Sequence, residues 1–155
     1  MTGFVTSELR EGRRRVGFAV ETFAGERVVL AHVELPGPPR VGKYGVDVAA
    51  FERVAVPVLA DIGDAEVVVI DELGKMELAS ERFRSAAWRL IDQPVAVVAT
   101  VHLARHPFTE ELKRQADIET VVVTVANRNE LPGRLLARLL AMRRGSGAPR
   151  RGRAR

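Results

Sequence analysis

The chain has 155 residues, a formal net charge of +4 and no cysteine. This length suits one domain with a sizeable core, and 46% apolar with 28% charged residues is typical of a globular protein. The lack of cysteine excludes disulfides, zinc–thiolate sites and thiol nucleophiles. No apolar run approaches the roughly 20 residues of a membrane span, and Met1 begins no visible signal peptide. We therefore expect a cytoplasmic protein that has no membrane partner.

The positive charge is concentrated at the C-terminal end. Six arginines and no acidic residue follow Met142. Without them, 18 basic residues stand against 20 acidic ones, so the body of the chain is not basic. The Gly, Ser, Pro and Arg content predicts a disordered tail over 143–155 that touches nucleic acid only weakly. We predict one domain over 1–142, and we expect a monomer.

The N-terminal part predicts antiparallel β structure. Alternating residues indicate strands over 3–9 and 15–21, and a third strand is expected over 26–35. Turns with a glycine, at 10–12 and 22–25, separate them. A proline-rich loop and a glycine-containing loop follow, so the next regular element is a helix.

The rest of the chain alternates helices and strands. Asp47 is a credible N-cap for a helix that ends near Ala60, which Pro57 should kink or split. The expected elements then follow in this order: strand 67–70, a helix capped by Ser80, strand 95–101, helix 107–115, buried strand 120–125, and a helix from Asn129 to Arg143 whose apolar face is Leu131, Leu135, Leu136, Leu139 and Leu140. This alternation predicts an α/β fold in which parallel strands are joined by right-handed crossovers.

Two adjacent acids end the first of these strands. The uninterrupted β-branched run over 67–70 is typical of a strand covered on both faces, and Asp71 and Glu72 follow it directly. Ligands of α/β sheets bind at the carboxyl ends of strands. An apolar strand followed by Asp-Glu is the Walker B pattern, in which Asp holds Mg²⁺ and the neighbouring acid orients or deprotonates a water. The alternative is a buried strand ending in two solvated acids that cap the next helix, and this pattern alone leaves both open.

Several motifs in the right order give a more specific indication. The segment 69–78 resembles the D-E-x-G-K-M-E-L motif of the cancer-related nucleoside-triphosphatase family. Segment 3–18 is similar to its G-F-x-T-E…G-x-R-x-G-F hairpin, and 41–59 to its V-G-x-Y-x-V-D…F-E…A-x-P-x-L stretch. The triplet 127–129 matches its N-R-[DN] signature. The resemblance covers most of the chain.

The resemblance implies a fold and an activity. The fold would be a RecA-like P-loop NTPase fold of three layers, with an N-terminal antiparallel hairpin region. The activity would be slow, Mg²⁺-dependent hydrolysis of nucleoside triphosphates (ATP, GTP or others) to diphosphate and phosphate, with little preference for the base. Asp71 would bind Mg²⁺, and Glu72 would lie beside the attacking water. Lys75 would offset charge that develops during phosphoryl transfer.

Three further residues carry implied roles. Thr100 would sense the γ-phosphate or its water, while Asn127 and Arg128 would border the base or ribose, with Arg128 stacking its guanidinium. Each has a structural alternative: Thr100 as a β-branched strand residue, and Asn127 and Arg128 as a helix N-terminus with a surface arginine. The residues alone leave both alternatives open.

One element of the family is not found in these 155 residues. The family carries a strand, a G-x-x-x-x-G-K-[ST] loop and a helix before the hairpin. Here Gly37 and Gly42-Lys43 have the right spacing, but Tyr44 replaces the Ser/Thr and no buried strand precedes them. We therefore expect the first β-P-loop-α unit to be missing because the sequence starts late, at an internal methionine. This should impair hydrolysis and leave apolar surface or a gap beside the strand of Asp71.

Two other functions compete with the enzyme. The chain would be a non-catalytic relic if it kept the fold and weak nucleotide binding only. It would be a small nucleic-acid-associated module if the arginine-rich tail were its functional part and the acids were structural.

Overall fold

A computed structural model describes residues 1–145, which group into two compact units, Met1–Ile118 and a second that begins at Glu119. The predicted tail over 143–155 overlaps the last three residues of the final helix, and its remainder lies outside the described residues. Within the described part, every helix is too short or too polar to cross a membrane.

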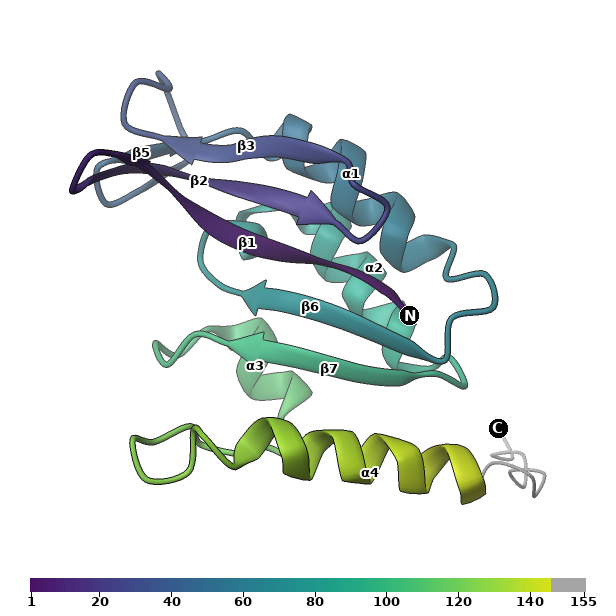
Figure 1. Cartoon of the computed structure of the whole chain (residues 1–155). Helices are drawn as coiled ribbons and strands as arrows, with labels where there is room; N and C mark the ends of the chain where they lie inside the picture. The colour runs from purple at the N-terminus through teal and green to yellow at the C-terminus, as the bar shows by residue number, and fades with distance from the viewer. Residues whose placement is uncertain (146–155) are drawn as a thin grey trace. The chain divides into compact units, whose positions relative to one another are not determined.

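The first unit is built on a seven-stranded mixed sheet in the order β4-β5-β3-β2-β1-β6-β7 (Figure 1). Its strands are β1 Thr2–Glu11, β2 Arg14–Thr22, β3 Arg27–His32, β4 Arg40–Val41, β5 Tyr44–Val46, β6 Val67–Leu73 and β7 Ala96–Val101. Strand β1 pairs antiparallel with β2 and parallel with β6, which pairs parallel with β7. The predicted hairpin and the parallel pair are confirmed. The expected loop over 41–46 is instead part of the short β4–β5 hairpin, because Gly42 adopts the positive φ of 59° that its turn requires.

A glycine allows β1 to lie against β6. Gly3 has a φ of +133°, and a Cβ atom on it would lie 2.0 Å from the carbonyl oxygen of Val69. Any other residue would push the two strands apart, so Gly3 secures the position of the hairpin beside β6. The expectation of a gap next to the strand of Asp71 is wrong, because β6 lies between β1 and β7.

The helices of this unit are α1 Val48–Ala60, the 3₁₀ turn η1 Glu77–Ala79, α2 Glu81–Ile91 and α3 Pro107–Leu112. The predicted N-caps of α1 and α2 are confirmed: Asp47 accepts a hydrogen bond from the Ala50 amide at 2.8 Å, and Ser80 accepts one from the Phe83 amide at 2.9 Å. Pro57 lies inside α1 and does not split it.

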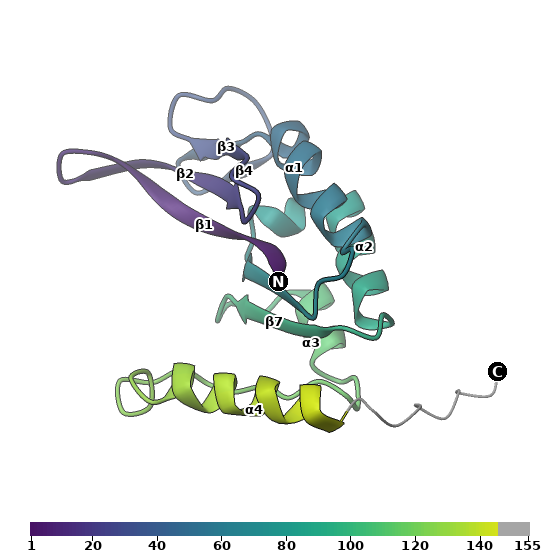
Figure 2. The same cartoon turned by 45° about the vertical axis from the view of Figure 1, so that its right-hand side comes forward.

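Helices α1 and α2 cover the same face of the sheet (Figures 1 and 2). The core at this interface contains Phe4 of β1, Phe51 of α1 and Phe83 of α2, all fully buried. Their rings meet edge to face at centroid distances of 4.8 to 5.8 Å, the arrangement that aromatic rings prefer.

The burial of β6 differs from the prediction. Val68 and Ile70 point into the core, whereas Val67 and Val69 are only half-buried. Within the first unit the strand is therefore fully covered on one face, not two. A continuous apolar run indicates a buried strand but does not show which layer covers each face.

The predicted buried strand over 120–125 is wrong. These residues have no regular secondary structure, and the side chains of Val122, Val123 and Val125 are 66%, 64% and 78% exposed. A β-branched run forms a strand only where a neighbouring strand satisfies its backbone groups. The described part of the second unit contains no other strand to pair with it.

The second unit contains helix α4, Leu131–Gly145. It begins two residues after the predicted cap Asn129 and ends two residues after the predicted end. Its predicted apolar face is only partly confirmed, because Leu131 is buried and Leu135 and Leu139 are half-buried, while Leu136 and Leu140 are exposed.

Ser80 offers a direct test of the helix cap. Its buried hydroxyl accepts from the Phe83 amide and donates to Oε1 of Glu52 at 2.6 Å. Replacement by alanine should lower the free energy of unfolding by about 1–2 kcal/mol, because both bonds are lost. Urea denaturation measures the change. The matched control Ser85→Ala, at an exposed position of the same helix, should stay within about 0.5 kcal/mol.

Candidate active site

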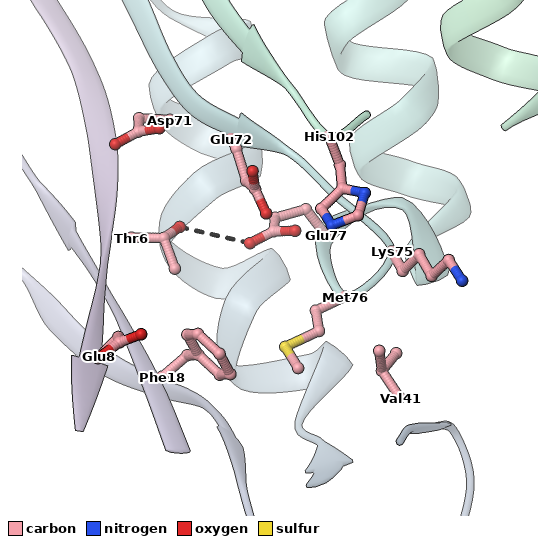
Figure 3. Close-up of a pocket in the computed structure, with 10 residues that line it drawn as sticks. All are labelled: Thr6, Glu8, Phe18, Val41, Asp71, Glu72, Lys75, Met76, Glu77 and His102. Carbon is pink, nitrogen blue, oxygen red and sulfur yellow. Dashed lines mark hydrogen bonds between the residues drawn. The ribbon is translucent and has the colours of Figure 1, made fainter. Parts of the chain in front are cut away.

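A cleft of about 280 Å³ lies at the carboxyl end of β6 (Figure 3). Strands β1, β2, β4 and β6, the loop after β6, the turn η1 and the residue after β7 contribute its lining. The lining residues are Thr6, Glu8, Phe18, Val41, Asp71, Glu72, Lys75, Met76, Glu77 and His102. The two predicted acids thus face a cavity at the end of a parallel strand, which is where ligands of α/β sheets bind.

Asp71 is held by the neighbouring strand. Strand β6 continues through both acids, and a cis peptide bond joins them. Ile70 lies opposite Ala99 in the parallel register, and the register between the two strands shifts directly after this pair. The hydroxyl of Thr100 donates a short hydrogen bond to Oδ1 of Asp71. This contact orients the carboxylate, as outer partners of metal ligands commonly do.

Glu72 lies beside a second carboxyl group, that of Glu77, for which the sequence alone predicted no role. A Cβ atom on Gly74 would lie 2.5 Å from Oε1 of Glu72 and 2.8 Å from Oε2 of Glu77. The missing side chain of Gly74 therefore lets the two carboxyl groups approach the same point, and Figure 3 shows them next to each other. The one feature of the sequence that could have pointed to Glu77 is its position between two apolar residues, Met76 and Leu78.

Glu77 is 2% exposed, which is unusual for a carboxylic acid. Its Oε1 accepts a hydrogen bond from the Thr6 hydroxyl at 3.3 Å, and the backbone amides of Glu77 and Gly74 also donate to the carboxylate. Burial raises the pKa of Glu77 to about 7, and the negative charge of Glu72 contributes in the same direction. The three hydrogen bonds act against this rise because they favour the charged form.

The other predicted residues have different surroundings. Lys75 lines the cleft, but its ammonium group points away from the two acids in Figure 3. The side chain of Asn127 donates to the carbonyl of Val122 and accepts from the amide of Thr124, both at 2.8 Å. These bonds give Asn127 a structural role in a turn. Asn127 and Arg128 belong to the second unit, and their contact with a nucleotide stays a prediction.

The donor chemistry of the cleft fits Mg²⁺ bound in part by a substrate. No group of three or more His, Asp or Glu side chains within the described residues is arranged to hold a metal alone. Mg²⁺ keeps several waters and is commonly bound by one or two carboxylates together with substrate phosphates. The oriented carboxylate of Asp71 meets this requirement, and the residues therefore fit the predicted ion.

Known proteins resemble this chain over most of its length. A family model described as "NTPase" matches residues 1–136. The chain is 38% identical over 144 residues to "Nucleoside-triphosphatase THEP1" of Thermotoga maritima, covering 92% of this chain and 82% of that relative. It is 40% identical over 143 residues to the human "Cancer-related nucleoside-triphosphatase", covering 83% of this chain and 75% of that relative.

Solved structures show the same similarity. The crystal structure of THEP1 from Aquifex aeolicus aligns with a TM-score of 0.80 at 33% identity, covering 89% of this chain and 83% of that one. The solution structure of a human cancer-related nucleoside triphosphatase aligns with a TM-score of 0.77 at 36% identity, covering 91% and 82%. The mixed sheet with its N-terminal hairpin is thus an arrangement that solved relatives share.

Proposed function

This chain belongs to the nucleoside-triphosphatase family of these relatives, and on that premise we propose that it hydrolyses nucleoside triphosphates to diphosphate and phosphate with Mg²⁺. One observation carries the proposal. Asp71 and Glu72 line a cleft at the end of β6, and Thr100 orients the first of them. A finer assignment of the fold as RecA-like and three-layered belongs to the same proposal.

The two acids have distinct tasks in this reaction. Asp71 holds the Mg²⁺ ion, which when bound neutralises charge on the phosphate oxygens. Glu72 accepts a hydrogen bond from the attacking water and takes its proton as the water oxygen bonds to the γ-phosphorus. The bond from phosphorus to the β-phosphate oxygen breaks, which leaves diphosphate and phosphate. Thr100 keeps Asp71 oriented, and Lys75 adds positive charge at the rim of the cleft.

The hydrolysis that we propose for these 155 residues is slow, because they lack the usual phosphate-binding loop. Enzymes of this class cradle the phosphates with backbone N–H groups and the lysine of a G-x-x-x-x-G-K-[ST] loop. These 155 residues contain no such motif. We therefore expect the chain, tested alone, to bind nucleotides weakly and hydrolyse them slowly.

Phosphate release from ATP and GTP tests the activity. We expect slow release with Mg²⁺ that EDTA abolishes, because the phosphates need a counter-ion. Asp71→Asn should cut the release by at least about tenfold, since the amide binds Mg²⁺ poorly. Asp64→Asn, an exposed residue ahead of β6, is the matched control. Nucleotide binding without turnover would support the non-catalytic relic instead, and neither binding nor turnover would refute both.

Gly74 tests the placement of Glu72. Alanine at this position would put a methyl group 2.5 Å from Oε1 of Glu72 and 2.8 Å from Oε2 of Glu77. We expect kcat to fall by about 100-fold, because a displacement near 1 Å is enough to misplace a catalytic group. Steady-state phosphate release measures kcat. Gly133→Ala, in helix α4, where a Cβ atom meets no neighbour, provides a control for the glycine-to-alanine change itself. An unchanged kcat in Gly74→Ala would contradict the assignment of Glu72.

A further inference from the structure

One acidic side chain is buried without a basic partner. Glu77 is the sole acid or base among the buried side chains of the described residues. Its donors are the Thr6 hydroxyl and backbone amides, not a lysine or arginine. Burying an ionised carboxylate without a cation is costly, and such a group commonly takes up a proton instead. The protein therefore holds, in the lining of the cleft, a carboxyl group that favours its neutral form.

The surroundings of Glu77 single out one partner. Glu72 is the charged group that approaches it, across Gly74. The other titratable groups that line the cleft are Glu8, Asp71, Lys75 and His102. On the two helices packed against η1, Glu52 of α1 is bound to Ser80 and Arg82, and Arg84 of α2 donates to the carbonyl of Leu78.

We propose that Glu77 is a positioning residue for Glu72: it carries the proton of the pair and holds the Glu72 carboxylate in place beside Gly74. This inference rests on the proposed hydrolysis. Glu77 is buried without a cation and lies beside the negative charge of Glu72, and both conditions favour its protonated form. Glu72 then keeps its place in the cleft without a second negative charge beside it. Thr6 ties this arrangement to strand β1, which gives the N-terminal hairpin a part in the site.

The first arm of the test observes the pair without relying on catalysis. Carbon-detected NMR follows the Glu77 side-chain carboxyl of the labelled full chain, and Glu77→Gln assigns the signal. We expect Glu77 to titrate well above the usual range of glutamate, and Glu72→Gln to lower that midpoint. The matched control Glu11→Gln, at the exposed end of β1, should leave the midpoint unchanged. A Glu77 midpoint in the usual range of glutamate, or one that Glu72→Gln leaves unchanged, would show that the two carboxyl groups do not interact as proposed.

The second arm measures kinetics. Glu77→Gln copies the neutral carboxyl, so kcat at pH 6 should stay within about threefold of the wild type, while Glu77→Ala should lower kcat by about 100-fold with little change in KM. The wild type should lose activity as pH rises through 7, and Glu77→Gln should lack this loss. If Glu77 were only structural, Glu77→Gln would have the same pH profile as the wild type, and it would not retain the activity that Glu77→Ala loses. Either result would overturn the positioning role.

The two proposals fail in different ways. If the wild-type chain releases no Mg²⁺-dependent phosphate, the proposed hydrolysis and with it the positioning role are refuted, while the NMR arm still decides whether the pair exists. If hydrolysis is present and the titration is ordinary, the positioning role alone is refuted. Denaturation of each variant confirms that kinetic losses come from folded protein.

Discussion

Glu72→Gln is expected to lower kcat for Mg²⁺-dependent phosphate release by at least about 100-fold, the usual contribution of a general base. Glutamine keeps the shape of the side chain and its ability to accept a hydrogen bond, but it does not take the proton of the attacking water. Nucleotide affinity should change little, because the substitution leaves Asp71 and Thr100 in place. Steady-state release over a range of ATP concentrations separates the two effects.

The control for this experiment is Glu34→Gln, an exposed acid that does not line the cleft. Its kcat should match the wild type. Were Glu72→Gln to retain full kcat, the proton would go elsewhere, and the acid pair at the end of β6 would lose its catalytic interpretation. A raised KM with unchanged kcat would instead make Glu72 a binding group.

The second large effect concerns the stability of the fold as a function of pH. Glu77 has a pKa of about 7 in the folded chain against 4.5 for an ordinary glutamate. Between these values the folded chain binds the proton that the unfolded chain has released, so stability falls as pH rises from about 4.5 to 7 and changes no further above that. At about 1.4 kcal/mol per pH unit, the full loss is roughly 3 kcal/mol.

The difference between wild type and Glu77→Gln isolates this contribution. We expect urea denaturation to show the variant gaining on the wild type steadily across that pH range, because glutamine has no proton to release. Glu11→Gln, where the side chain is exposed, should follow the wild-type curve. Parallel curves for the wild type and Glu77→Gln would mean that Glu77 ionises as readily in the folded chain as in the unfolded one.

Several predictions that depend on interactions between residues close in sequence were correct. The caps at Asp47 and Ser80 act on amides three residues away, and the structure confirms both. The first hairpin follows from alternation and from a turn at Gly12, whose φ is 59°. Motifs in a consistent order also identified the family. The wrong predictions concern pairing and burial, as in the exposed run over 120–125.

The sequence by itself determined the hairpin, the capped helices, the strand that carries Asp71 and Glu72, and the family. Only the tertiary structure decided that β1 lies beside β6, that Thr100 binds Asp71, and that Glu77 is buried beside Glu72. The physical reason is distance along the chain. Caps and turns join residues a few positions apart, whereas the bond from Thr6 to Glu77 spans 71 positions and forms only when the sheet assembles.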